Sequence, residues 1–135
     1  MNSNAANGLK GKQESILVLE DESMLRMMIE EVLRTFGYNV QAAASGEEAL
    51  QTWRQHQGRF DLLLTDMLLP DGINGRQIAE QLKAESANLK VVYASGFTSE
   101  TLEGIQEELV EGVNFLQKPY TTKTLAQTVR QCLAA

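Results

Sequence analysis

The sequence has a single cysteine and no long apolar run, and its basic residues are outnumbered by its acidic ones. One cysteine excludes an intramolecular disulfide framework, and we interpret Cys132, on the apolar side of a predicted helix, as a core residue and not as a reactive thiol. Twelve Lys and Arg against eighteen Asp and Glu give a net charge of −6 at pH 7. Because such a surface repels phosphate backbones, we expect no direct nucleic-acid binding.

Segments that direct a chain to or across a membrane are also lacking. Apolar runs such as residues 16–19 fall far short of the roughly 18–20 residues of a membrane span. Residues 1–14 contain three Asn and two Gly and no apolar stretch of a secretory signal, so they are predicted to form a flexible leader. We therefore expect no membrane insertion, a cytoplasmic location, and one folded domain over residues 15–135.

Short apolar runs alternate with longer segments whose apolar residues have helical spacing. The runs open at Ile16, Tyr38, Phe60, Leu89 and Val113. Residues 16–19 and 62–64 are apolar without alternation, which is typical of parallel strands covered on both faces. The pattern predicts a (βα)5 α/β fold with one doubly wound parallel sheet.

The predicted helices carry signals at their ends as well as along their apolar faces. Gly37 stands where a left-handed cap would end the first helix, and Ser45 with Glu48 forms a capping-box pattern at the start of the second. The fourth helix is predicted from Leu102, Ile105 and Leu109.

Polar residues follow four of the five predicted strands. Glu20 and Asp21 follow the first strand, and the third, fourth and fifth strands lead into Asp66, Ser95 and Lys118. Ligands gather beyond the carboxyl ends of the strands in an open parallel sheet. If the first and third strands are neighbours, roughly 5 Å apart, their three carboxylates share one pocket, and their repulsion would raise a pKa or require a counter-ion.

This set of side chains indicates a phosphoryl-transfer site. Mg²⁺ is a hard cation that one or two carboxylates hold together with waters and a phosphate. Lys118 and Ser95 would supply a positive charge and a hydrogen-bond donor for that phosphate. Asp66, at the end of a central strand, is placed to act as a carboxylate nucleophile that forms an aspartyl phosphate.

Four spaced segments resemble the receiver domain of two-component response regulators. They are Ile-Leu-Val-Leu-Glu20-Asp21-Glu22, Leu-Leu-Leu-Thr-Asp66-Met-Leu-Leu-Pro70, Ala-Ser95-Gly96 and Phe115-Leu-Gln-Lys118-Pro119-Tyr120. The resemblance covers about residues 15–134. It implies a flavodoxin-like fold of strand order 2-1-3-4-5 and a phosphoryl group received from a histidine kinase or a histidine phosphotransfer protein.

The resemblance also implies a role for each residue of the site. Asp66 would be the phosphoacceptor, and it would bind Mg²⁺ together with Asp21 and the backbone carbonyl of Leu68, while Glu20 would act through a water. Ser95 and Lys118 would contact the phosphoryl oxygens. Phe115 would be the aromatic residue that turns inward on activation. Such a domain catalyses its own phosphorylation and dephosphorylation and has no separate enzymatic output.

Two features depart from the commonest receiver pattern. Glu20 stands where Asp is more usual, which changes the outer geometry of the metal site. Residues 70–75 are one residue longer than in many receivers. The longer form, with Ser95-Gly96-Phe97 and the Lys-Pro-Tyr segment, is similar to receivers fused to hybrid sensor histidine kinases.

Other functions fit the residues less well. A phosphatase of the haloacid dehalogenase type needs an acid two positions after its nucleophile, where this chain has Leu68. A flavodoxin-like nucleotide carrier needs a phosphate loop after the first strand, where the acidic residues would repel a phosphate. The remaining alternative is a pseudo-receiver, an interaction module that keeps the fold without phosphorylation.

Two further expectations concern signalling. The chain ends at Ala135 directly after the fifth predicted helix, so we expect output through a partner protein at the fourth helix, fifth strand and fifth helix. The fourth helix is rich in glutamate, which favours a partner with basic residues at its rim. Leu68 and Phe97 would flank the path of an attacking water, and neither can orient one, so the aspartyl phosphate should hydrolyse slowly.

Overall fold

A computed structural model describes residues 13–69, 74–96 and 109–134 of the chain. Within these ranges the chain forms β1 (Ser15–Leu19), α2 (Ser23–Thr35), β2 (Asn39–Ala43), α3 (Gly46–Gln55), β3 (Leu62–Asp66), α4 (Gly75–Glu85), β4 (Lys90–Ser95), β5 (Phe115–Gln117) and α5 (Thr122–Ala134). Each strand begins within two residues of its predicted start. Leu102 and Ile105 of the predicted fourth helix, and residues 1–12 of the predicted leader, lie outside the described ranges.

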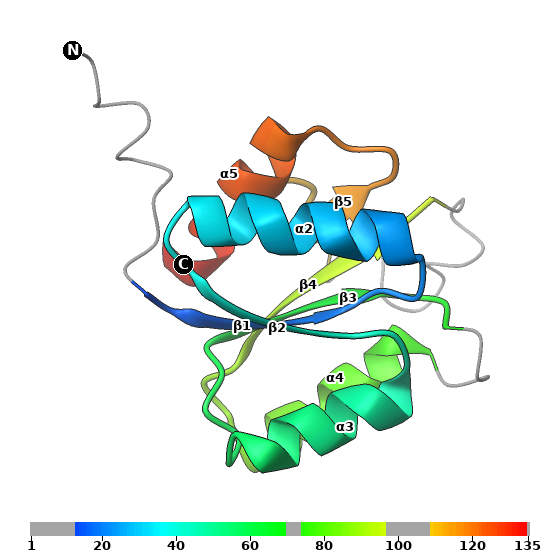
Figure 1. Ribbon diagram of the computed structural model, residues 1–135, viewed down its shortest axis with the longest axis vertical. Helices are drawn as coiled ribbons and strands as arrows, with labels where there is room; N and C mark the ends of the chain where they lie inside the picture. Colours follow the sequence, from blue (N-terminus) through cyan, green and yellow to red (C-terminus); the bar gives the residue numbers. More distant parts are fainter. Residues whose placement is uncertain (1–12, 70–73, 97–108, 135) are drawn as a thin grey trace.

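The five strands form one parallel sheet in the order β2-β1-β3-β4-β5, which confirms the predicted topology (Figure 1). In the central pair, Leu19 at the end of β1 is opposite Thr65 of β3. On the other side of β3, Asp66 is opposite Ala94 of β4. Because all strands run in the same direction, the residues that follow β1, β3, β4 and β5 meet at one edge of the sheet.

Apolar side chains cover both faces of the sheet, as the strands without alternation predicted. Helices α2 and α5 lie on one face, and α3 and α4 lie on the other (Figure 1). Under α2 and α5, Ile16 and Val18 of β1 pack in a cluster that includes Ile29 and Leu125. On the opposite face, the intervening Leu17 and Leu19 pack in the α3 and α4 cluster. The sheet is therefore held rigidly between two cores, and its edge is free to carry polar residues.

Short-range signals set the ends of the helices. Gly37 has a φ of 93°, as the predicted cap of the first helix requires. The Ser45 hydroxyl accepts a hydrogen bond from the Glu48 backbone N–H at 3.1 Å, which confirms this N-cap. The reciprocal bond differs from the prediction, because the Glu48 carboxylate accepts from the Ala44 N–H at 2.7 Å. A complete capping box occurs instead at the start of α4, between Asn74 and Gln77.

The lone cysteine is a core residue, as predicted. Cys132 is buried in α5, and its Sγ atom lies 3.8 Å from the Val91 carbonyl oxygen of β4. Burial raises the pKa of the Cys132 thiol, which disfavours the reactive thiolate.

None of the helices in the three described ranges combines the length and the apolar character that crossing a bilayer requires.

Gly75, the first residue of α4, lies directly against the end of β3. Its N–H donates to the Met67 carbonyl at 2.9 Å. A Cβ atom built on Gly75 would lie 2.1 Å from the Asp66 backbone oxygen and 2.7 Å from the Thr65 hydroxyl. Only glycine allows α4 to approach Asp66 this closely, so this position couples the helix to the site.

We expect Gly75→Ala to lower the free energy of unfolding by about 2 kcal/mol, because the added methyl group overpacks this contact. Helix propensity alone would give the opposite sign, since alanine is about 1 kcal/mol better than glycine inside a helix. Urea denaturation of both proteins measures the difference. Gly96→Ala is the matched control, because its Cβ would meet the Lys118 Cβ at an ordinary 3.6 Å. A more stable Gly75→Ala variant would contradict the close contact.

Candidate functional site

Three carboxylates converge at the edge of the sheet where β1 and β3 end. Glu20 follows β1, and its backbone N–H continues the pairing with β2 by donating to the Ala43 carbonyl at 3.1 Å. Asp21 is exposed beside it, and Asp66 is the last residue of β3. Glu20, Asp21 and Asp66 each offer a carboxylate oxygen within 4.8 Å of the others. The structure thus brings these three together as the sequence predicted.

Lys118 connects two of these carboxylates. It follows β5, and its Nζ atom lies 3.0 Å from Glu20 Oε1 and 3.0 Å from Asp66 Oδ2. The exposed fractions are 22% for the Lys118 side chain, 3% for Glu20 and 12% for Asp66. An ammonium group so placed offsets part of the cost of burying Glu20.

Burial and charge shift two pKa values in the cluster. Burial raises the pKa of Glu20 above its usual value, although the Glu22 N–H and Lys118 act in the opposite direction. For Lys118, burial alone would lower the pKa, but the hydrogen bonds to Asp66 and Glu20 outweigh it and raise the pKa. Lys118 therefore stays protonated at neutral pH. One ammonium beside three carboxylates leaves the pocket with an excess of negative charge.

The other predicted site residues differ in burial. Ser95 is buried at the end of β4, next to the Ala94 that pairs with Asp66. Leu68 is 44% exposed, two positions after Asp66. Phe115 is buried and packs against Met67. Phe97 lies outside the residues that the structure describes.

Three neighbours of the site carried no role in the sequence analysis. The Arg26 side chain donates to the backbone carbonyls of Glu20 and Asp21, and the Thr65 hydroxyl donates to the Asp66 carbonyl at 2.9 Å. Tyr120 packs against the α2 and α5 core, and burial together with the nearby carboxylates raises the pKa of its hydroxyl. A basic residue one turn into the helix that follows an acidic strand end is a signal that could have identified Arg26.

The donor chemistry of the pocket fits a hard divalent cation. Carboxylate and carbonyl oxygens are the ligands that Mg²⁺ takes, and it keeps several waters besides. Asp21 is exposed and has a carboxylate within 4.8 Å of the other two. The negative excess left after Lys118 gives such a cation a favourable electrostatic position.

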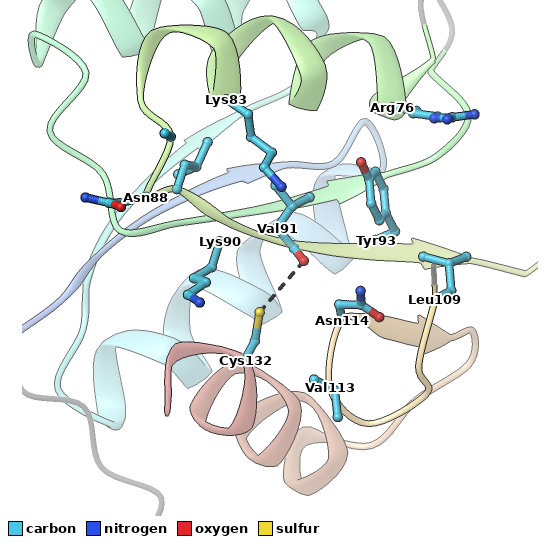
Figure 2. A pocket seen from close by; sticks show the side chains of 12 residues that line it. Arg76, Lys83, Asn88, Lys90, Val91, Tyr93, Leu109, Val113, Asn114 and Cys132 are labelled. Atoms are coloured by element: carbon cyan, nitrogen blue, oxygen red, sulfur yellow. Dashed lines mark hydrogen bonds between the residues drawn. The ribbon is translucent and has the colours of Figure 1, made fainter. Parts of the chain in front are cut away.

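A second cavity, of about 660 Å³, lies away from the acidic cluster, between α4, β4 and α5 (Figure 2). Lys83 and Lys90 are in its lining, as is Cys132, whose thiol points toward the Val91 carbonyl (Figure 2). Among the residues that the structure describes, none of those that line the cavity carries a carboxylate. The carboxylate cluster for which the sequence predicts phosphoryl transfer is thus a different part of the structure from this cavity.

Comparison with known families gives one match over most of the chain. The family model described as the response regulator receiver domain matches residues 16–130.

Individual proteins are similar over the same region. Sensor kinase CckA of Brucella abortus (strain 2308) is 31% identical over 120 residues, which are 88% of this chain and 12% of the kinase. Sporulation initiation phosphotransferase F of Bacillus subtilis (strain 168) is 30% identical, and the match covers 89% of this chain and 94% of that protein. The chain spans 49% of a probable transcriptional regulator, ycf27, of Porphyridium aerugineum. It thus spans half or less of the length of several curated relatives.

Solved structures agree with these relatives. The receiver domain of the hybrid histidine kinase CckA is 37% identical, has a TM-score of 0.71, and the match covers 88% of this chain and 98% of that one. A response regulator receiver protein from Sinorhizobium medicae WSM419 is 27% identical, with a TM-score of 0.78 and coverage of 92% and 97%.

We expect Mg²⁺ to stabilise the folded chain and Asp21→Asn to remove that effect. A ligand that binds only the folded state adds about 1.4 kcal/mol at ten times its Kd. Without metal, Asp21→Asn should unfold at the same or a higher temperature than the wild type, because it relieves carboxylate repulsion. Thermal unfolding with and without Mg²⁺ measures both effects.

The matched control is Asp61→Asn, at the opposite end of the strands, where the Asp61 carboxylate accepts from the Ser15 N–H at 2.8 Å. This variant should respond to Mg²⁺ as the wild type does. An undiminished Mg²⁺ response of Asp21→Asn would place the cation elsewhere.

Proposed function

Because the chain belongs to the response regulator receiver domain family, which signals by phosphorylation, we propose that it accepts a phosphoryl group on Asp66. The observation that carries this proposal is the position of Asp66 itself. Its carboxylate ends a central strand, lies within 4.8 Å of two other carboxylates, and binds the Lys118 ammonium at 3.0 Å. A strand-end carboxylate between acidic ligands and a fixed cation suits attack on a phosphorylated donor.

The transfer balances as a displacement at phosphorus. An oxygen of the Asp66 carboxylate attacks the phosphorus of a phosphohistidine, a P–O bond forms, and the P–N bond to the imidazole breaks. The released imidazole nitrogen keeps the bonding pair and takes a proton. Lys118 neutralises charge on the transferred oxygens, and the Ser95 hydroxyl donates a hydrogen bond to one of them.

A divalent cation belongs to this proposal. The carboxylates of Asp21 and Asp66 and the backbone carbonyl of Leu68 would hold Mg²⁺, and Glu20 would act through a water. When bound, Mg²⁺ supplies positive charge that stabilises the phosphoryl group during its transfer.

The switch that follows phosphorylation would begin at Lys118 and Ser95, which the new dianion draws toward itself. Phe115, the third residue of this proposal, is already only 6% exposed and packs with Met67. We therefore expect its packing against Met67 to change on phosphorylation and its exposure to change little. The predicted output surface includes the helix predicted from Leu102, Ile105 and Leu109, which is distinct from α4, together with β5 and α5. Of this surface, the structure describes β5, α5 and Leu109.

The donor in this proposal is a histidine kinase or a histidine phosphotransfer protein, and the likeness to a hybrid kinase receiver supports it. Met24 and Met27 of α2 are 78% and 65% exposed, although methionines bury readily. Met24 shares a surface groove with Lys118 and Tyr120. The exposed Met24, in the same groove as the Lys118 that binds Asp66, suits contact with a protein that must bring a phosphohistidine to the site.

Asp66→Asn should abolish phosphorylation, because an amide cannot replace the carboxylate nucleophile. We expect the wild type to gain one phosphoryl group, labile to base, after incubation with Mg²⁺ and acetyl phosphate, as intact-mass analysis would show. Asp61→Asn should be labelled like the wild type. Equal labelling of Asp66→Asn would refute the acceptor assignment, and an unlabelled wild type would favour a pseudo-receiver.

Leu68→Asn should speed the loss of the phosphoryl group, because an amide can orient the attacking water that leucine cannot. We expect decay about tenfold faster than in the wild type, within the range that positioning of a reactant supplies. Time-resolved intact mass after removal of the donor gives the rates. Val110→Asn, which replaces another exposed apolar residue at 54% exposure, serves as the control. Identical decay in wild type and Leu68→Asn would contradict the water-access argument.

A further inference from the structure

Arg26 donates hydrogen bonds to three consecutive backbone carbonyls just after β1, two from its side chain and one from its backbone N–H. Its Nη1 atom donates to the Glu20 carbonyl at 2.9 Å and to the Asp21 carbonyl at 3.3 Å. Its own backbone N–H donates to the Glu22 carbonyl at 2.9 Å. The first two contacts come from the guanidinium and fix the two carbonyls that precede α2, whereas the third is the ordinary first backbone hydrogen bond of the helix.

Because peptides are planar, the contacts of Arg26 with the two carbonyls also orient the N–H groups that follow them. In a trans peptide the C=O and the following N–H point in opposite directions. The carbonyls of Glu20 and Asp21 face Arg26, so the N–H groups of Asp21 and Glu22 face away from it. The Glu22 N–H donates to Glu20 Oε2 at 3.0 Å. The orientation of this donor is therefore linked to the guanidinium of Arg26.

The Glu20 carboxylate connects the Glu22 N–H to Lys118 and, through Lys118, to Asp66. With Oε2 held by the Glu22 N–H, its other oxygen, Oε1, binds Lys118 Nζ at 3.0 Å, and Lys118 binds Asp66 Oδ2. Glutamate has one more rotatable bond than aspartate, so its carboxylate needs two fixed contacts to hold one position. The chain of contacts runs from Arg26 through the Glu22 peptide and Glu20 to Lys118 and Asp66.

We infer that Arg26 is a positioning residue for the phosphoryl transfer, an inference that rests on the function proposed above. It orients the Glu22 N–H, which fixes the Glu20 carboxylate, and Glu20 in turn holds the Lys118 ammonium at Asp66. A guanidinium suits this role because it is always charged and has several N–H donors in a rigid plane, enough to bind two carbonyls with one group.

The test compares the wild type with Arg26→Gln and Arg26→Lys. Arg34→Gln is the matched control, because Arg34 also lies on α2 and donates to a backbone carbonyl, that of Val40 at 3.0 Å, away from the site. The first readout is the Glu22 amide, followed by NMR chemical shift and hydrogen exchange without any donor. The second is the rate of labelling by acetyl phosphate at saturating Mg²⁺, measured over a range of donor concentrations.

We expect Arg26→Gln to shift the Glu22 amide and to speed its exchange while the amides of β1 and β3 keep their protection. The maximal labelling rate should fall about tenfold, the scale on which loss of an outer hydrogen-bond partner acts at metal sites. The donor concentration at half-maximal rate should change less than twofold. Arg26→Lys, which keeps the charge but loses the planar fork of donors, should still shift the Glu22 amide and should recover only part of the rate, and Arg34→Gln should match the wild type in both readouts.

An unchanged Glu22 amide in Arg26→Gln, or a wild-type labelling rate in that variant, would overturn the inference while leaving Asp66 as the acceptor. An equal loss of rate in Arg34→Gln would also overturn it, because the effect would then be one of general stability. If Arg26→Gln does not fold, Arg26→Lys decides between the same outcomes, since a rate equal to the wild type with an unmoved Glu22 amide would refute positioning by the guanidinium. Failure of the proposed function is distinct, because it leaves the wild type itself unlabelled.

Discussion

The balance of charge between three carboxylates and one ammonium is the constraint on which the rest of the site depends. Glu20 is buried, and a buried charge without a partner costs several kcal/mol. Lys118 supplies that partner from a position 98 residues away in the sequence. Lys118, directly after β5, must therefore lie close to the ends of β1 and β3. The negative charge that remains in the pocket favours the binding of a cation.

The sheet makes this balance possible because it is rigid and parallel. Two apolar clusters, one on each face, hold the strands in register, and every strand presents its carboxyl end at the same edge. Small residues then permit close approach, as Gly75 does where α4 meets the Asp66 carbonyl. A scaffold of this kind holds reacting groups to within a fraction of an ångström, which is what positioning catalysis requires.

Glu20 and Arg26 determine how the Lys118 ammonium is shared between the carboxylates of this pocket. The glutamate reaches both the Glu22 N–H and Lys118, so the ammonium is shared between two carboxylates. In the proposed reaction a phosphoryl dianion on Asp66 would compete with Glu20 for Lys118. The strength with which Glu20 holds Lys118 then influences both how readily the site reacts and how far Lys118 moves afterwards. Arg26 acts on this balance through the backbone, without touching a reacting atom.

Local patterns in the sequence determined the strands, the single parallel sheet and the helix ends at Gly37 and Ser45, because hydrophobic periodicity and turn chemistry act over a few residues. The polar residues at the strand ends singled out Glu20, Asp21, Asp66 and Lys118, and the resemblance to receivers supplied the strand order that places the ends of the first and third strands side by side. Contacts that depend on side-chain length and peptide orientation were decided only by the tertiary structure. They include the ion pairs of Lys118 with both Glu20 and Asp66. They also include the hydrogen bond from the Ala44 N–H to the Glu48 carboxylate and the two from Arg26 to the Glu20 and Asp21 carbonyls. Such contacts leave no periodic signal, because they depend on where rotatable side chains and peptide planes come to rest once the chain has packed.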